Sequence, residues 1–297
     1  MISAAEDRPH GGALLAVAAA AILFGTTGTA QALGPDSTTA LGVGAVRVAI
    51  GAVGLLVLSA RAAVSDVARP TTSRTTLIAG GLGVAGYQVG FFVGTERAGV
   101  ALGTIVALGS GPFFAGVYET CRTRQRPSGI WLGATVLAGI GMACVAVARS
   151  SPTTSISMSG VFAALGAGLS YTVFSVSTKS AIEGGVPSTQ VMANAFSIGA
   201  AMMCPFLLTE PMSWLITGRG VIVALHLGIA ATAVAYALFG FGLSSLSVPT
   251  VVTVTLAEPA TAAILSVVVL HQPLSLFGWT GVALVLCGVA LVGLRAR

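Results

Sequence analysis

Apolar stretches of about twenty residues alternate with short polar connectors along almost the whole chain. A helix of roughly 20 apolar residues crosses a bilayer core about 30 Å thick. Ten stretches have this length, so the pattern predicts an all-α integral membrane protein with ten transmembrane helices. The predicted spans are 12–33, 40–60, 76–95, 98–118, 129–148, 159–179, 189–208, 220–241, 248–270 and 275–294.

The composition supports a membrane location. Hydrophobic residues make up 55% of the 297 residues and charged residues only 8%, whereas an ordinary globular domain has roughly 25% charged residues. A soluble protein with so few charges could not cover its surface. The 39 glycines fit the same conclusion, because small residues let membrane helices approach one another closely.

The net charge of +5 does not indicate a nucleic-acid partner, because the chain has one lysine and its arginines lie mostly in short connectors. The four cysteines show no CxxC spacing, and three of them lie in apolar stretches. They fit small apolar residues better than a disulfide framework or a metal site. We therefore expect no metal and no cofactor. The cysteines are Cys121, Cys144, Cys204 and Cys287.

The basic residues predict the orientation, because positive charges gather in cytoplasmic connectors. With a cytoplasmic N-terminus, ten basic residues lie on the cytoplasmic side, and only Arg97, Arg149 and Arg219 lie outside. This bias predicts a multi-pass protein of the cell inner membrane with both termini in the cytoplasm. The ten cytoplasmic residues are Arg8, Arg61, Arg69, Arg74, Arg122, Arg124, Arg126, Lys179, Arg295 and Arg297.

The first apolar stretch has a second interpretation. Arg8, the apolar run 13–24 and the tripeptide 30–32 together resemble a cleavable signal peptide. An internal repeat favours a retained helix, because the repeat needs this segment.

The fourth and ninth predicted spans contain similar stretches, Leu108–Ala115 and Thr255–Ala262. Each holds a proline, and Pro112 and Pro259 are 147 residues apart. Since this offset is about half the chain, we predict two repeats, 12–149 with spans one to five and 157–295 with spans six to ten. The same offset relates Phe92 to Phe239, Gln125 to Gln272 and Gly141 to Gly288.

Five helices is an odd number, so the second repeat enters the membrane from the opposite side. In transporters with such inverted repeats the substrate site lies near the bilayer midplane between the repeats, and rocking exposes it to each side in turn. Pro112 and Pro259 are the candidate hinges.

The motif around Pro259 is the most distinctive part of the chain. The ninth span contains Ala257–Ala263 with the sequence AEPATAA, the turn Leu270–Leu274 follows, and the last span contains Gly281 and Gly288. This ending resembles that of the EamA family of the drug/metabolite transporter superfamily. The first repeat matches at Gly109-Ser110-Gly111-Pro112, Gly133 and Gly141, and Arg47 is similar to an arginine often found in span two.

The resemblance covers residues 12 to 294 and implies two EamA repeats of five helices. It also implies a transporter of amino acids, drugs or other metabolites, which some members export and others import. One feature departs from the family pattern. The family commonly has a glutamate in the turn after the proline helix, whereas Gln272 and Gln125 stand there in this chain, so a charged role of that turn is not implied.

Two ionisable residues within predicted spans need an explanation, because a charge inside the bilayer costs several kcal/mol unless it is paired, hydrated or neutralised. Glu258, near the middle of span nine, would contact a substrate amine, carry a coupling proton, or serve as a structural acid beside the Pro259 kink. Arg47, about seven residues into span two, would face the cavity, tie helices together or extend to the membrane surface. A pairing of Arg47 with Glu258 would satisfy both groups.

Other polar side chains fall within the predicted spans. Each one alone fits hydrogen bonding between helices, but tyrosine and amide groups also suit ligand contact. No metal-ligating group shares the helix face of the histidine among them, so no metal site is expected. We predict that these residues line the substrate cavity with Glu258 and Arg47. They are Tyr87, Gln88, Ser170, Tyr171, Asn194, His226 and Tyr236.

Other function classes lack their motifs in this chain. An intramembrane enzyme would need paired acidic motifs, HExxH or GxSxG, and an ATP-driven pump would need a P-loop. A channel would need a ring-forming polar helix. We therefore expect a secondary transporter that exports small metabolites such as amino acids or drugs, and not an enzyme. A facilitative or exchange carrier is the alternative. The expected partners are the substrate, the bilayer and protons, for a monomer or a homodimer.

Overall fold

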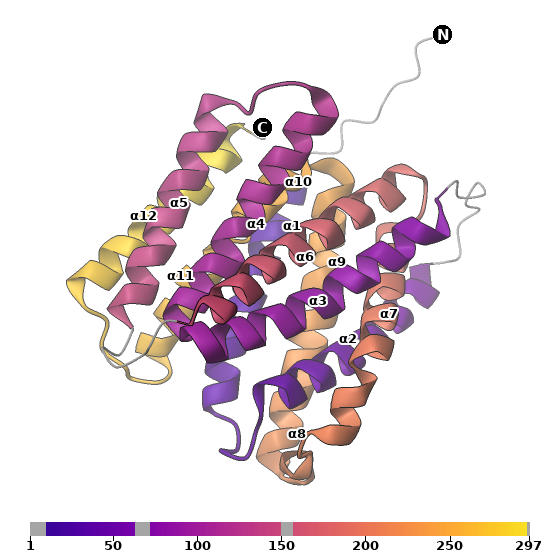
Figure 1. The fold of residues 1–297 in the computed structure, drawn as a ribbon, viewed down its shortest axis with the longest axis vertical. Coiled ribbons are helices and arrows are strands. Elements are labelled where there is room, and N and C mark those ends of the chain that lie inside the picture. The colour runs from indigo at the N-terminus through magenta and orange to yellow at the C-terminus, as the bar shows by residue number, and fades with distance from the viewer. Residues whose placement is uncertain (1–9, 63–71, 150–156, 296–297) are drawn as a thin grey trace.

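The computed structural model describes residues 10–62, 72–149 and 157–295. Within these ranges the regular structure is entirely helical, and the helices pack into one bundle (Figure 1). Each span of the first half is a single helix. The five are α1 (His10–Ala32), α2 (Ala40–Ala62), α3 (Arg74–Ala98), α4 (Val100–Thr123) and α5 (Gly129–Ala148).

The second half has the same number of spans, but two of them are interrupted. A short 3₁₀ helix, η1 (Ser213–Ile216), follows the seventh span. The eighth span contains a π-helical segment, η2, and the ninth is broken in its middle. The elements are α6 (Met158–Glu183), α7 (Ser188–Thr209), α8 (Gly218–Leu225), η2 (His226–Val234), α9 (Ala235–Ser245), α10 (Val248–Val254), α11 (Ala257–Val268) and α12 (Leu276–Arg295).

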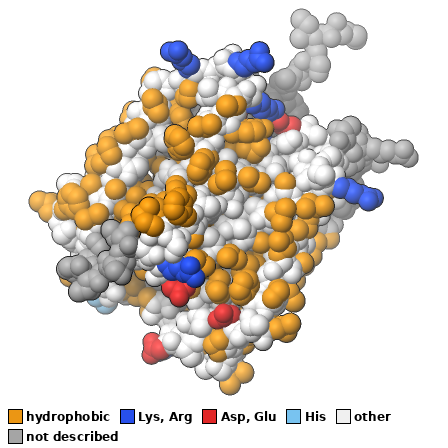
Figure 2. All heavy atoms as spheres, in the orientation of Figure 1, with side chains coloured by type: hydrophobic (Ala, Val, Ile, Leu, Met, Phe, Trp, Pro, Cys, Tyr) orange, Lys and Arg blue, Asp and Glu red, His pale blue; other side chains and the backbone are white. Residues whose placement is uncertain are grey.

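Ten helical stretches among the described residues are long and apolar enough to cross a membrane, which confirms the predicted count. Figure 2 shows hydrophobic side chains over the flank of the bundle and charged side chains mainly near its two ends. The observed spans are generally longer than predicted, because polar residues at their ends remain helical. Span four, for example, continues to Thr123 and span eight to Ser245. Arg8, Arg69 and Arg297 lie outside the described residues.

Serine hydroxyl groups cap the N-termini of several helices. Each accepts a hydrogen bond from a backbone N–H of the first turn that would otherwise be unpaired. The Ser73 side chain accepts from Thr76 N and the Ser128 side chain from Trp131 N. Ser247 does the same for Thr250 N in the second half. These caps fix the connectors between spans at the bundle ends.

The helix contacts are symmetric between the two halves of the chain: a contact recurs when each helix is replaced by its counterpart in the other half. α3 packs along α6, and its counterpart in the other half, the eighth span, packs along α1. α4 contacts α6 just as α11 contacts α1. The pairs α2 with α7 and α5 with α12 join equivalent helices. This pattern is the one expected of two inverted five-helix repeats.

In the α5–α12 pair the symmetry between the two halves holds for individual residues. A Cβ added to Gly141 would lie 2.6 Å from both Gly281 O and Val285 N. A Cβ added to Gly288 would lie 2.6 Å from Ala134 O and 2.8 Å from Ala138 N. The residues 147 positions after Ala134 and Ala138 are Gly281 and Val285, which are the two residues that Gly141 contacts. The offset read from the sequence therefore relates equivalent positions in space.

Replacing Gly141 with alanine is expected to destabilise the α5–α12 contact. The new methyl group would meet backbone atoms that cannot move aside independently, and overpacking of this kind costs about 1–3 kcal/mol. The measurement is unfolding of the purified protein in detergent. Gly139→Ala on the same helix is the control, because no atom of the described part of the chain lies within 4 Å of its added Cβ. Equal stability of the two variants would contradict the close contact.

Candidate functional site

The ninth span breaks at Thr255 and Leu256, between α10 and α11. Pro259 has no backbone N–H, so it cannot donate to the Thr255 carbonyl as a helix residue would. The N–H of Glu258 donates to that carbonyl instead, at 3.0 Å. The break places Glu258 in the first turn of α11, within the membrane-spanning region.

The two candidate hinges differ in structure. Pro259 lies three residues after the break, whereas α4 continues as one helix through Pro112. The position equivalent to Glu258 in the first repeat is Gly111, 147 residues earlier. Thr172 Oγ1 donates to Gly111 O at 3.1 Å, and a Cβ added at Gly25 would lie 2.8 Å from Glu258 O, so the two carbonyls are packed in equivalent ways. Only the second repeat carries an acid at this position.

The π-helical segment η2 interrupts the eighth span just before α9. Thr232 Oγ1 donates to Leu227 O, five residues earlier, at 2.7 Å. Helix α2 crosses η2 closely, because a Cβ added at Gly228 would collide with the side chain of Ile50. Single π turns are frequent at functional sites. Here the segment positions Tyr236, and α2 carries Arg47 on the turn next to this crossing.

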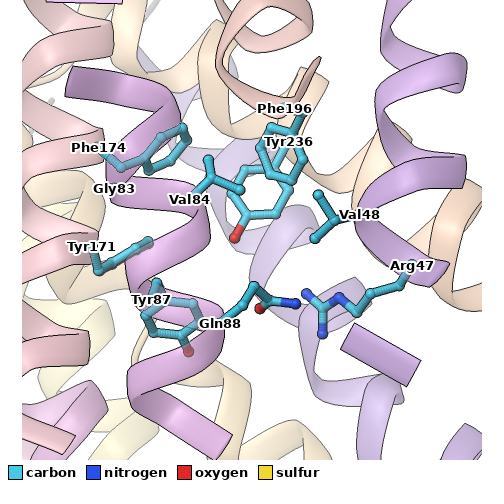
Figure 3. Close-up of a pocket in the computed structure, with 10 residues that line it drawn as sticks. All are labelled: Arg47, Val48, Gly83, Val84, Tyr87, Gln88, Tyr171, Phe174, Phe196 and Tyr236. Atoms are coloured by element: carbon cyan, nitrogen blue, oxygen red, sulfur yellow. The ribbon is translucent and has the colours of Figure 1, made fainter. Parts of the chain in front are cut away.

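A small cavity lies between the two repeats (Figure 3). Its walls come from α2 and α3 of the first repeat and from α6, α7 and α9 of the second. The cavity volume is about 10 Å³, which is room for about one water molecule. The side chains therefore nearly close the site. The lining residues are Arg47, Val48, Gly83, Val84, Tyr87, Gln88, Tyr171, Phe174, Phe196 and Tyr236.

Aromatic rings form most of the apolar wall. The ring centroids of Phe196 and Tyr236 are 4.3 Å apart, and those of Phe174 and Tyr236 are 5.6 Å apart. Tyr87 and Tyr171 are separated by 5.6 Å. The edge-to-face arrangement of Phe174 and Tyr236 is a favourable one for an aromatic pair. The wall joins the two repeats, since Tyr87 belongs to α3 and Tyr171 to α6.

Arg47 brings the only charge among the lining residues. Figure 3 shows its guanidinium pointing into the site beside the side-chain amide of Gln88. The Nε atom of Arg47 is buried and has no hydrogen-bond partner among the residues that the structure describes. The Gln88 side chain donates to Gly44 O at 3.3 Å and is thereby held against α2.

Arg47 and Glu258 do not form a direct ion pair. The ion pairs among the described residues join Arg122 to Glu183 and Lys179 to Glu183. The direct pairing considered from the sequence is therefore not formed in this structure.

The structure brings five of the predicted residues to the cavity wall: Arg47, Tyr87, Gln88, Tyr171 and Tyr236. The other four lie outside the lining.

Two of those four have evident packing roles. Ser170 packs where α3 meets α6, because a Cβ at Gly86 would lie 2.6 Å from its hydroxyl. His226 Nε2 hydrogen-bonds the Thr26 hydroxyl at 2.8 Å and joins η2 to α1. Asn194 is partly buried on α7, and Glu258 lies on α11.

Sequence reasoning missed five lining residues. Phe174 lies one helical turn after Tyr171, so the spacing of three residues could have indicated it. Val48, Gly83, Val84 and Phe196 carry no polar group, and nothing in the sequence separates them from residues that pack elsewhere. Among the described residues no group of three His, Cys, Asp or Glu side chains could hold a metal ion.

The two repeats are also tied together at both ends. At the end predicted to be cytoplasmic, Arg122 Nη2 of α4 lies 3.1 Å from Glu183 Oε2 of α6. Beside this pair, Thr72 Oγ1 donates to Ala181 O at 3.3 Å. The Thr26–His226 hydrogen bond joins the repeats toward the opposite end.

Comparison with known proteins agrees with this architecture. The sequence profile of the EamA-like transporter family matches residues 158–294. The chain is 36% identical over 286 residues to the uncharacterized transporter YwfM of Bacillus subtilis (strain 168), and the match covers 95% of this chain and 94% of the relative. The chain belongs to the EamA-like transporter family.

A second relative of this EamA-like transporter is the uncharacterized inner membrane transporter YicL of Salmonella typhimurium (strain LT2). It is 24% identical over 217 residues, which are 73% of this chain and 71% of the relative. A solved crystal structure with 20% sequence identity shares the fold, with a TM-score of 0.81 over 95% of this chain and 98% of that chain. The resemblance to the EamA family of the drug/metabolite transporter superfamily is therefore confirmed, and the chain is a multi-pass membrane transporter.

Proposed function

We propose that this EamA-like chain is a secondary transporter that exports small metabolites, such as amino acids or drugs, by alternating access. The observation that carries the proposal is the nearly closed cavity between two inverted repeats, lined from both of them. A substrate could enter only if the repeats move apart. The chain would lie in the inner membrane with both termini in the cytoplasm, as its basic residues predict.

In this mechanism the two repeats, 12–149 and 157–295, rock against each other around the cavity. The inner end opens when α4 separates from α6, which breaks the contact of Arg122 with Glu183. The outer end opens when α1 separates from η2, which breaks the contact of Thr26 with His226. The break before Pro259 is a suitable hinge because the regular helical hydrogen bonding is already interrupted there, whereas Pro112 would have to bend an intact helix.

Each candidate residue has a separate part in this proposal. The aromatic wall would hold the body of the substrate, and Arg47 with Gln88 would hold its polar group. Glu258 would bind and release the coupling proton. Ser170, Asn194 and His226 would join the site only in open states, because none of them lines the closed cavity.

The alternative is a facilitative or exchange carrier that uses no proton. The single acid at the helix break favours proton coupling, since the equivalent position of the other repeat is a glycine. An intramembrane enzyme is a weaker candidate, because the relatives are named as transporters.

Transport by membrane vesicles of defined orientation tests this function. Cells that overexpress the protein are first screened for growth in the presence of toxic amino-acid analogues and drugs. Any solute whose toxicity falls is then tested in inside-out and right-side-out vesicles. For an exporter, accumulation is expected only in inside-out vesicles. Accumulation only in right-side-out vesicles would contradict export, and equal vesicle uptake with and without the protein would contradict transport of that solute.

A further inference from the structure

The cavity has an unbalanced charge that indicates what it binds. Arg47 is the only charged lining residue, and its guanidinium makes no hydrogen bond to any residue that the structure describes. An arginine remains charged at physiological pH. A buried donor without a partner is unfavourable by roughly 1–3 kcal/mol. The site is therefore incomplete as it stands, and an acceptor that enters it would complete it.

Resting on the proposed function, we propose that the cavity selects organic monocarboxylates with a flat apolar body, and that Arg47 anchors their carboxylate. The planar guanidinium matches the two oxygens of a carboxylate and can bind both at once. A substrate amine would instead be repelled by Arg47. The proposal thus names the chemical class of the ligand at this site.

Gln88 extends the anchor. The side-chain amide nitrogen of Gln88 carries two hydrogens, and it donates one of them to Gly44 O. The second hydrogen is available to a ligand oxygen. Figure 3 shows this amide beside the guanidinium, so a carboxylate bound by Arg47 would also be within its reach.

The remainder of the wall fits a flat apolar body. Five of the ten lining residues are aromatic, and their rings already stack or tilt against one another. A flat ring could replace some of these contacts with equivalent ones when the cavity opens. The aromatic residues are Tyr87, Tyr171, Phe174, Phe196 and Tyr236.

The two repeats differ at the anchor. The residue 147 positions after Arg47 is Asn194, which is neutral and does not line the cavity. A carboxylate therefore has one binding position and not two related by the pseudo-two-fold axis. The ligand would keep the same anchor while the repeats rock around it.

The test compares three ligands with the same phenylpropyl skeleton on the purified full-length protein: 3-phenylpropionate, its nearly isosteric amide 3-phenylpropionamide, and the amine 3-phenylpropylamine. Binding is measured by the shift of the melting temperature with ligand concentration, because a ligand stabilises the folded state that binds it. We expect the acid alone to stabilise the protein at millimolar concentration. Equal stabilisation by the amide or the amine, or no effect of the acid, would overturn the proposal.

Variants of Arg47 give the second arm. Arg47→Asn installs the residue of the other repeat and should weaken binding of the acid by about ten- to a hundredfold, as expected for the loss of a charged hydrogen-bond partner. Arg47→Lys should retain part of the affinity. The exposed Arg97 provides the control, and Arg97→Gln should bind the acid like the wild type. The ligand series on the wild type decides the question if Arg47→Asn does not fold.

Failure of this proposal can be told apart from failure of the proposed function. If the protein transports solutes in vesicles but the amide and the amine bind as well as the acid, the proposed transport function is supported and the proposed carboxylate site is refuted. If the acid binds selectively through Arg47 but the vesicles accumulate no solute, the proposed carboxylate site is supported and the proposed transport function is refuted.

Discussion

Covalent linkage of positions 122 and 183 is expected to stop transport almost completely. These residues lie on α4 and α6, which belong to different repeats, and their side chains meet at 3.1 Å. Alternating access requires these helices to separate at the inner end. A short covalent bridge would hold the protein closed on that side, and each transport cycle would end there.

The ion pair alone should matter much less than the bridge. The Arg122 and Glu183 side chains are 49% and 41% exposed, and an exposed ion pair contributes about 0–1 kcal/mol. Arg122→Gln should therefore change the transport rate by less than about tenfold. The contrast between the bridge and this variant separates a block of motion from the loss of an interaction.

The experiment uses R122C/E183C in a background without the native cysteines, including the neighbouring Cys121. A short, cleavable bifunctional thiol reagent forms the bridge, and uptake into vesicles is measured before and after its cleavage. K179C/E183C is the matched control, because both positions lie on α6 and a bridge within one helix blocks no movement. Wild-type transport by the bridged R122C/E183C protein would refute rocking at this end.

The second large effect concerns Glu258. Its carboxyl group lies at the helix break within the membrane, where a persistent charge costs several kcal/mol unless it is compensated. A group in this position can bind a proton on one side and release it on the other. Glu258→Gln cannot do so, and pH-driven accumulation in vesicles should fall to the level of empty vesicles.

Exchange of labelled for unlabelled substrate should continue in Glu258→Gln, because exchange needs no net proton movement. Glu119→Gln is a suitable control, since Glu119 lies at the predicted cytoplasmic end of α4. Proton coupling that survives in Glu258→Gln would show that this carboxyl is not the carrier. Loss of both accumulation and exchange would point to a structural role of the acid.

The spans and the repeat could be predicted because each rests on a property of the chain alone. Length and apolar content defined the ten spans, and the 147-residue offset between Pro112 and Pro259 predicted the symmetry seen around Gly141 and Gly288. The interruptions were less predictable. The π segment coincides with the Thr232 hydrogen bond and with the close fit of Gly228 against α2, and no local sequence pattern reveals such contacts.

The two prolines illustrate the same limit. Pro112 and Pro259 occupy equivalent positions, yet the helix breaks only beside Pro259. The residues that face the two equivalent carbonyls also differ: Thr172 donates a hydrogen bond to the Gly111 carbonyl, whereas the equivalent Gly25 has no side chain that could donate to the Glu258 carbonyl. The position of a proline in the repeat therefore does not by itself predict a break.

For the candidate site, polar side chains in apolar spans were the useful signal. This signal identified Arg47 and Gln88, because a polar group inside the membrane is unfavourable unless it has a bonding partner or a ligand. It also selected Ser170 and His226, whose groups serve contacts between helices. Phe196 was missed since an aromatic ring in an apolar helix is equally suited to lipid, to the core or to a ligand.

The nearly filled cavity affects how ligand affinities of this protein should be read. In the proposed mechanism a metabolite, which is far larger than one water, binds only to molecules in which the repeats have already moved apart. If about one molecule in a hundred is open, the apparent dissociation constant is roughly a hundredfold weaker than the intrinsic one. Substitutions that loosen the closed form would then tighten apparent binding without touching the ligand.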